Sequence, residues 1–202
     1  EKEVLHKNQT YGCFPVPISS FVVPEHNKLK QDILRWMKDQ ELNPTHARNQ
    51  ISHNVVEIGK TNELLKALPH LKQTLIDLVD KHNKNTFNYS VRYDIVESYL
   101  ELAQEQAIYA PHEHANAVFS CTYFINFNNE IHSSLKFRRH IFSTFYPSLQ
   151  LPSSQQTSFN MPEVIVPHGE GDLLIYPSNL THGYESNPSD QRITLSFNVA
   201  PV

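Results

Sequence analysis

Two segments in the first third of the chain carry apolar residues at helical spacing. In residues 24–40, leucine, isoleucine and tryptophan recur every three or four positions after a proline and an acidic start, which predicts an amphipathic helix. Residues 61–83 carry a longer stripe of leucine, isoleucine and valine, and Pro69 should kink this helix or restart it. The stretch between the two helices is polar, and we expect it to be a loop with a short strand at Val55–Ile58.

From about residue 87 the period changes from helical to alternating. The segment 117–127 ("AVFSCTYFINF") is rich in β-branched and aromatic residues, and the short runs "LKFRRH", "PEVIVP", "GDLLIYP" and "RITLSFNVAP" follow it between Pro, Gly, Asn and Ser. The longest stretch without a pattern, 143–161, is predicted to be a lid or binding loop. We therefore expect one domain over 1–202, with helical support in about 1–86 and an antiparallel sandwich or barrel after it.

Composition excludes several classes of protein. Hydrophobic residues make up 39% of the 202 positions, which is enough for a sizeable core. The net charge of −4 argues against binding to nucleic acid. The two cysteines have no zinc or redox spacing, no apolar run is long enough to cross a membrane, and the first ten residues do not resemble a signal peptide. We expect a soluble, cytoplasmic protein in a reducing compartment.

The segment "YAPHEH" at residues 109–114 places two histidines one residue apart at the edge of a predicted strand. Residues i and i+2 of a strand share a face, so His112 and His114 should point the same way and Glu113 the opposite way. Two imidazoles on one face can bind one metal ion, and His182 can supply a third ligand. Three ligands on one face leave positions open for substrate and oxygen, as a non-haem iron oxygenase requires. A His-x-His pair alone is more often a surface pair than a ligand set.

The last predicted strand has one apolar and one polar face. The apolar face consists of Ile193, Leu195, Phe197 and Val199, and the polar face of Arg192, Thr194, Ser196 and Asn198. Arg192 lies ten residues after His182, a spacing that a hairpin could fold back toward the metal. A guanidinium binds a carboxylate through two hydrogen bonds, and a hydroxyl beside it can add a third. Arg192 with Thr194 or Ser196 therefore predicts a site for a dicarboxylate cosubstrate.

These residues together resemble the iron(II)- and 2-oxoglutarate-dependent dioxygenases, in particular the prolyl-hydroxylase-like branch with its bacterial and phage members. The family pattern is Y-x-x-H-x-[D/E] followed by a distal H-x10-R-x-[S/T], and the matching residues here are Tyr109, His112, His114, His182, Arg192 and Thr194. The runs "HEHANAVFSCTYFINF" and "GDLLIYPSNLTHGY" through "RITLSFNV" are similar to one subfamily. The resemblance covers roughly residues 95–200.

The resemblance implies a double-stranded β-helix, also called a jelly roll, that binds Fe(II), 2-oxoglutarate and O2. It implies that Arg192, helped by Thr194, binds the distal carboxylate of 2-oxoglutarate. Tyr109 and Tyr123 are further candidates for the ketoacid pocket, each with packing in the core as the alternative. The family decarboxylates 2-oxoglutarate to succinate while it hydroxylates a C–H bond. The substrate would be a small molecule, a peptide or a protein residue such as proline, and the enzyme a monomer or homodimer.

The sequence departs from the family pattern at His114, where the usual ligand is aspartate or glutamate. We favour His112, His114 and His182 as ligands, with sets that include Glu113 or Asn116 as alternatives. A three-histidine site carries one negative charge less, which leaves two other functions open. One is a three-histidine oxygenase of the thiol-dioxygenase kind that uses no ketoacid, and the other is a metal-binding module without catalysis.

Several remaining residues are expected to have no role at the site. We expect His132, His140 and His168 to lie on the surface and Cys121 to be buried and inert. In the basic run at residues 136–140, the segment "RRH" (138–140) is expected to form a solvated face, with substrate docking as the alternative.

Overall fold

The computed structural model describes residues 14–45, 51–139 and 152–202. The helices are α1 (His26–Met37), α3 (Glu63–Ala67) and α4 (Pro69–Asn85). The strands are β1 (Ser19–Val22), β2 (Leu42–Pro44), β3 (Ser52–Ile58), β4 (Tyr93–His112), β5 (Phe119–Asn126), β6 (Lys136–Arg138), β7 (Glu163–Val164), β8 (Asp172–Pro177), β9 (His182–Tyr184) and β10 (Arg192–Pro201).

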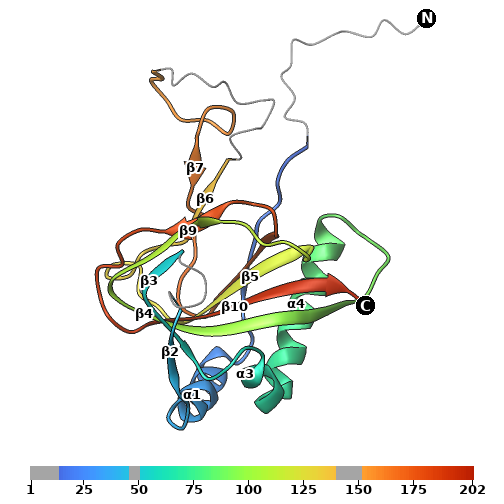
Figure 1. The fold of residues 1–202 in the computed structure, drawn as a ribbon. Coiled ribbons are helices and arrows are strands. Elements are labelled where there is room, and N and C mark those ends of the chain that lie inside the picture. The colour runs from blue at the N-terminus through green and yellow to red at the C-terminus, as the bar shows by residue number, and fades with distance from the viewer. Residues whose placement is uncertain (1–13, 46–50, 140–151) are drawn as a thin grey trace, which may run out of the picture.

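All strand pairs are antiparallel, and they form one curled sheet in the order β1-β8-β5-β10-β4-β9-β6-β7, with β3 and β2 added beside β4. The 20-residue strand β4 joins the two halves of this sheet. Its first half pairs with β10 and its last residues pair with β9, so the strand bends from one layer to the other (Figure 1). This half-barrel is the jelly-roll architecture expected from the sequence.

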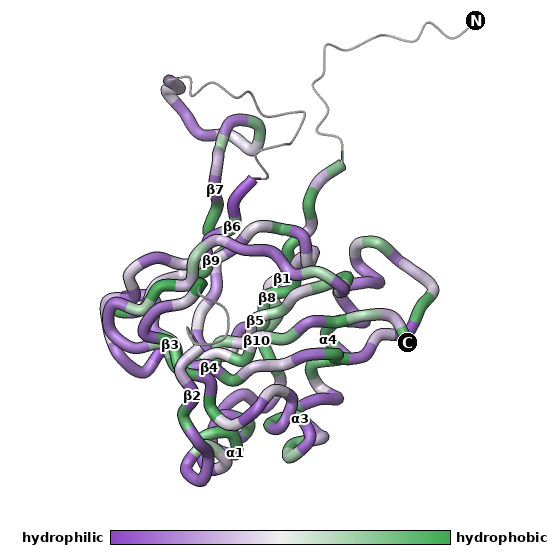
Figure 2. Tube along the Cα trace, in the orientation of Figure 1, coloured by the Kyte–Doolittle hydropathy of each residue, from purple (hydrophilic) through white to green (hydrophobic). Residues whose placement is uncertain are grey.

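The helices cover one face of the sheet (Figure 1). The larger core cluster joins Ile33 of α1 and Leu75 of α4 to Leu195 and Phe197 of β10. A second cluster, with Phe124 and Phe137, lies within the curled sheet. Hydrophobic positions recur within the strands and helices, whereas the connecting loops are largely hydrophilic (Figure 2). Because the apolar face of β10 packs toward the helices, its polar face must point into the half-barrel.

Most elements predicted from periodicity are confirmed. The first helix is α1, and Pro69 begins α4 immediately after α3, so this proline restarts the helix. The short strand expected at Val55–Ile58 is the end of β3. The short strands β1, β2 and β9 were not predicted from the sequence. Among the described residues, no helix is both long and apolar enough to cross a membrane.

Some expectations are wrong, and others concern residues outside the described ranges. His132 and His168 are buried, each 6% exposed, and do not lie on the surface. His132 joins two loops, because its ring accepts a hydrogen bond from the Asn128 amide and donates one to the Asp190 carbonyl. His140 and part of the loop 143–161 lie outside the described residues. The single domain expected over 1–202 stays a prediction.

The buried His82 makes the fold sensitive to acid. It is 0% exposed between the Ser19 hydroxyl, 2.7 Å from Nδ1, and the Phe119 ring, and burial lowers its pKa to about 4. As the pH falls below about 6.5, the unfolded chain binds a proton that the folded chain rejects, so stability falls until about pH 4. We expect His82→Leu to remove up to about 3 kcal/mol of this pH-dependent loss.

The measurement for His82 is urea unfolding of metal-free protein between pH 7 and pH 4. The exposed His70 on α4 is the control for the loss of a histidine as such, and His70→Leu is measured over the same pH range. Equal slopes in wild type and His82→Leu would contradict the prediction.

Candidate active site

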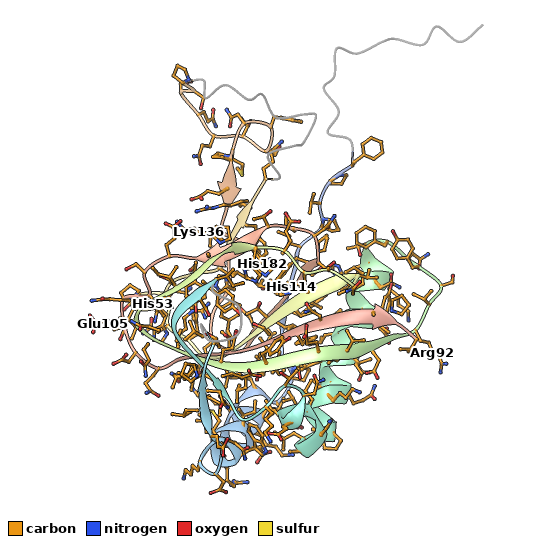
Figure 3. The ribbon with its side chains drawn as sticks, viewed as in Figure 1. His53, Arg92, Glu105, His114, Lys136 and His182 are labelled. Atoms are coloured by element: carbon orange, nitrogen blue, oxygen red, sulfur yellow. The ribbon has the colours of Figure 1, made fainter. Side chains whose placement is uncertain are left out.

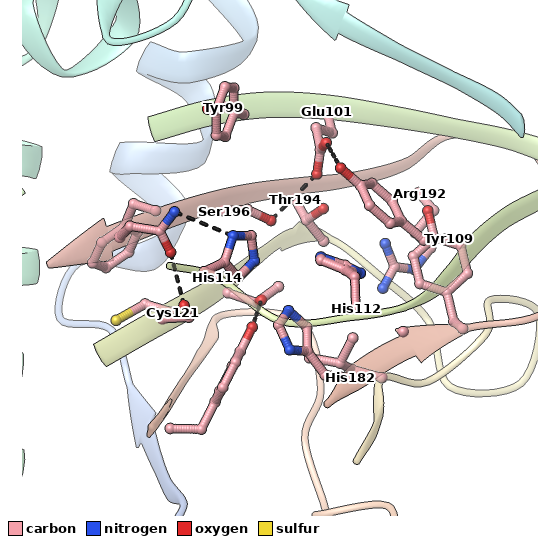
Figure 4. Close-up of a pocket in the computed structure, with 18 residues that line it drawn as sticks. Tyr99, Glu101, Tyr109, His112, His114, Cys121, His182, Arg192, Thr194 and Ser196 are labelled. Atoms are coloured by element: carbon pink, nitrogen blue, oxygen red, sulfur yellow. Dashed lines mark hydrogen bonds between the residues drawn. The ribbon is translucent and has the colours of Figure 1, made fainter. Parts of the chain in front are cut away.

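His112 at the end of β4, His114 two residues after it and His182 at the start of β9 lie close together (Figure 4), and Figure 3 shows where His114 and His182 lie in the fold. His112 and His182 are register partners across the two strands, with ring centroids 4.4 Å apart. The His114 ring lies 4.9 Å from that of His112 and 5.1 Å from that of His182. One ligand atom from each of the three can be chosen so that all lie within 4.8 Å of one another. The described residues therefore contain a three-histidine cluster compact enough for one metal ion.

The environment keeps the three imidazoles neutral, as metal ligands must be. Burial, together with a smaller effect of neighbouring imidazoles, lowers the pKa of His182 to about 3 and that of His114 to about 4. The pKa of His112 is lowered by burial too. Nδ1 of His112 and of His182 donates to the backbone carbonyls of Ala110 and Leu180, each at 2.8 Å. Their Nε2 lone pairs are therefore available to an ion, and the donor set fits the iron of a non-haem site.

The two alternative ligands lie outside this cluster. Glu113 is exposed and accepts a hydrogen bond from the Thr181 hydroxyl at 2.6 Å, as strand alternation predicts. Asn116 is exposed and adopts a positive φ of 59° in the turn after β4. The geometry thus supports His114, and not Glu113 or Asn116, as the third member of the set.

A pocket opens beside the histidines, with the polar face of β10 as its floor (Figure 4). Its lining includes the expected polar residues of β10, namely Arg192, Thr194, Ser196 and Asn198. Tyr109, which β4 contributes, also lines it. Arg192 and Thr194 are each 2% exposed, so this face is not solvated.

Arg192 is a buried cation that lines the pocket, and within the described ranges its side chain donates one hydrogen bond, from Nε to the Ser133 carbonyl at 3.1 Å. Its guanidinium lies 4.1 Å from the centroid of the Tyr184 ring. Burial lowers its pKa, whereas Tyr184 and Glu101 raise it. A buried guanidinium directed into a pocket is suited to an anionic ligand, which would compensate the loss of its hydration.

Tyr123 does not join the pocket. It lies on the other face of β5, fully buried in the core beneath α1, and its hydroxyl is 2.7 Å from Nδ1 of His26. The pocket face of β5 carries Thr122, which is hydrogen-bonded to the Tyr176 hydroxyl at 3.1 Å. Strand alternation places Tyr123 on the face of β5 opposite Ser120 and Thr122, and the structure shows that the face with Ser120 and Thr122 meets the pocket.

Two pocket-lining residues of β4, Tyr99 and Glu101, were not predicted from the sequence. Glu101 is 5% exposed, lies opposite Thr194 in register and accepts hydrogen bonds from the Tyr109 and Ser196 hydroxyls at 3.1 and 3.3 Å. Tyr99 lies opposite Ser196 on the same face. The signal was present in the alternation of "ESYLE", but only the pairing with β10 shows that this face is the pocket.

The basic run has a structural explanation. Arg138 forms ion pairs with Glu163 and Glu185, and Lys136 lies 3.5 Å from Glu163. These contacts fix β6 to β7 and to the segment after β9. The solvated face expected here is thus a network of surface ion pairs in the described residues.

Gly183 permits the close approach of β9 to β4. A Cβ at this position would lie 2.5 Å from the Tyr109 carbonyl oxygen and 3.0 Å from the Ala110 carbonyl, and these backbone atoms cannot rotate away. We expect Gly183→Ala to separate β9 from β4, to lower stability by about 1–3 kcal/mol and to weaken metal binding. Thermal unfolding with and without metal measures both effects. Gly169→Ala is the control, because its Cβ would meet only the Asp172 carboxylate at 3.9 Å.

Comparison with protein families identifies the class. Residues 97–198 match the family described as "Putative 2OG-Fe(II) oxygenase", and this segment contains all three histidines and Arg192. The chain belongs to this family. It is therefore a 2OG-Fe(II) oxygenase, and its cofactors are iron and 2-oxoglutarate, as the resemblance implied. No curated protein sequence matches the chain significantly.

Solved structures of 2OG-Fe(II) oxygenases share the fold. A prolyl-4-hydroxylase from Pseudomonas putida is 14% identical, with a TM-score of 0.59 over 91% of this chain and 92% of that one. HygX from Streptomyces hygroscopicus, crystallised with nickel, 2-oxoglutarate and hygromycin B, is 9% identical, with a TM-score of 0.59 over 93% and 84%. The alpha-ketoglutarate-dependent epimerase SnoN from nogalamycin biosynthesis is 12% identical, with a TM-score of 0.63 over 91% and 76%. At these identities the likeness shows the jelly-roll fold.

Proposed function

We propose that this oxygenase is a hydroxylase that acts on a C–H bond of a small molecule, peptide or protein residue. The observation that carries the proposal is the buried, pocket-facing guanidinium of Arg192 in the same pocket as three neutral histidines. A metal-binding module without catalysis has no need for a buried cation at this position. A thiol oxygenase without a ketoacid has no dicarboxylate to bind there.

The residues then divide the work of binding. His112, His114 and His182 hold the iron through neutral imidazoles on one side of the pocket. Arg192, with the Thr194 hydroxyl beside it on the same strand face, binds the distal carboxylate of 2-oxoglutarate. Iron and 2-oxoglutarate, when bound there, would supply the chemistry that couples decarboxylation of the ketoacid to succinate with oxidation of the substrate.

Tyr109 is positioned so that its hydroxyl can donate a hydrogen bond to the ketoacid. Its ring lies 4.9 Å from that of His112, and its hydroxyl donates to Glu101 Oε1 at 3.1 Å. Rotation of this hydroxyl toward the pocket would offer a further donor to the ketoacid.

Prolyl 4-hydroxylation is one version of the proposed activity that the neighbour from Pseudomonas putida suggests. The net charge of −4 gives no reason to expect a nucleic-acid substrate.

The test is an anaerobic titration of the iron(II)-loaded protein with 2-oxoglutarate, recorded as a visible spectrum. A ketoacid chelated to iron(II) gives a weak charge-transfer band, and we expect this band in the wild type but not in His114→Ala. Tyr123→Phe is the control, because Tyr123 lies outside the pocket and its loss should leave the band intact.

Each outcome of this titration separates the alternatives. A band that persists in His114→Ala would show that another residue is the third ligand. Iron binding without any band would contradict the proposal, and oxygen uptake with a thiol alone would then favour the three-histidine oxygenase that uses no ketoacid.

A further inference from the structure

The three histidines of the cluster differ in what their Nδ1 atoms contact. Nδ1 of His112 and of His182 faces a backbone carbonyl at 2.8 Å. A carbonyl oxygen can only accept, so the proton of each neutral ring is on Nδ1 and the lone pair is on Nε2. These two residues are thus held in the tautomer that a metal ion needs.

His114 has the opposite partner. Its Nδ1 lies 3.3 Å from Nδ2 of Asn198, and an amide nitrogen can only donate. Nδ1 of His114 therefore accepts, and the proton of the neutral ring is on Nε2. Because the amide occupies Nδ1, Nε2 is the nitrogen left for the ion (Figure 4). His114 is thus held in the tautomer that cannot bind a metal through that atom.

Glu97 fixes the orientation of the Asn198 amide. Glu97 and Ser120 lie opposite Asn198 on the two strands that flank β10. Nδ2 of Asn198 donates to Glu97 Oε2 at 3.1 Å, and Oδ1 accepts from the Ser120 hydroxyl at 2.7 Å. Turning the amide would place Oδ1 against the carboxylate, whereas the hydroxyl can donate or accept and fits both orientations. Glu97 is therefore the residue that decides which way the amide points.

We propose that Glu97, acting through Asn198, holds His114 as the Nε2–H tautomer in the metal-free protein, so that ligation by His114 requires the Asn198 amide to turn. Glu97 and Asn198 are then positioning residues for the third ligand, and this role rests on the proposed three-histidine site. In the exchange, the proton on Nε2 leaves to solvent and Nδ1 takes one up, so the ring stays neutral. The new Nδ1–H donates to Asn198 Oδ1. Metal binding by His114 therefore breaks the hydrogen bond from Asn198 Nδ2 to Glu97. Because this loss opposes ligation, His114 is the weakest of the three ligands.

The first experiment reads the tautomer directly. Two-bond proton–nitrogen correlation spectra of metal-free protein with ¹⁵N-labelled histidine distinguish protonated from bare ring nitrogens, and the signal lost in His114→Gln assigns His114. We expect a bare Nδ1 at His114 but a protonated Nδ1 at His112 and His182. Glu97→Ala removes the acceptor that fixes the Asn198 amide, so the amide can turn and the His114 proton should move to Nδ1. Glu105→Ala, the same change at an exposed position of β4, should leave it on Nε2.

The second experiment measures the consequence for the ion. Co(II), which is stable in air, is titrated calorimetrically into the wild type and Glu97→Ala. We expect at least about 10-fold tighter binding in the variant, the scale typical of partners of metal ligands. Loss of the negative charge alone would weaken the binding, so the direction of the change is diagnostic.

The two experiments test the role of Glu97 and Asn198 independently of the proposed hydroxylase function. A proton on Nδ1 of wild-type His114, or one that stays on Nε2 in Glu97→Ala, would overturn the tautomer assignment. A shifted tautomer with unchanged or weaker Co(II) binding would overturn the link to the metal. Neither experiment uses 2-oxoglutarate or turnover, so a failure of the proposed hydroxylase activity would be seen only in the spectral titration.

Discussion

Replacing Arg192 with methionine is expected to weaken 2-oxoglutarate binding by at least about 100-fold. Two hydrogen bonds from a charged donor contribute about 1.5–3 kcal/mol each, and a 100-fold loss corresponds to about 2.7 kcal/mol. Methionine is long enough to keep contact with the Tyr184 ring, which lies 4.1 Å from the guanidinium. Replacing a buried charge with an apolar side chain should not unfold the protein. The loss should therefore appear in binding and not in stability.

The measurement is the ketoacid titration of iron(II)-loaded protein, with a thermal unfolding curve for each variant. Arg192→Lys keeps the charge but loses the planar fork, so we expect it to fall between wild type and methionine. Arg138→Met is the matched control, because Arg138 pairs with Glu163 and Glu185 outside the pocket. Wild-type affinity in Arg192→Met would remove Arg192 from the site and, with it, the main support for the proposed function.

Replacing His182 with alanine is expected to lower Fe(II) affinity by more than about 100-fold. Loss of a residue that merely supports a metal ligand costs about 10–100-fold, and loss of a ligand should cost more. His182 is the most enclosed of the three, at 4% exposure, and its ring lies 4.4 Å from that of His112 and 5.1 Å from that of His114. No other described residue belongs to this ligand cluster, so a substitute ligand is not at hand.

Anaerobic competition with a chromophoric chelator measures the Fe(II) affinity. His70→Ala, on the exposed side of α4, is the control for the loss of a histidine as such and should bind iron like the wild type. Iron affinity within a few-fold of the wild type in His182→Ala would contradict the three-histidine site. The comparison with His114→Ala then ranks the ligands, and we expect the smaller loss at His114.

The candidate site shows which parts of a sequence can be interpreted locally. The two-residue period correctly separated His112 and His114 from Glu113, and it correctly grouped Arg192 with Thr194. Both inferences concern neighbours on one strand, where alternation fixes the face. The same rule separates Tyr123 from Ser120 and Thr122 on β5, but because both faces of this strand are buried, only the fold shows which face meets the pocket.

The polar residues that β4 places beside β10, and one buried histidine, were beyond local inference. Glutamates such as Glu97 and Glu101 are typical of a solvent-exposed strand face. Only the register of β4 with β10 places them opposite Asn198 and Thr194. His132 has the composition of a surface residue too, yet its ring is buried between two loops, where backbone groups satisfy both nitrogens.

The sequence alone determined the family, the helix restart at Pro69, the polar face of β10 and the identity of three candidate ligands, because each follows from local spacing or from a motif. The tertiary structure decided the rest. The pairing of His112 with His182 joins residues 70 positions apart, and it depends on β4 bending from one layer to the other. The partner of each imidazole nitrogen likewise depends on strands that meet only in the folded chain. Strand pairing at such separation is set by the packing of the whole sheet, which no local pattern encodes.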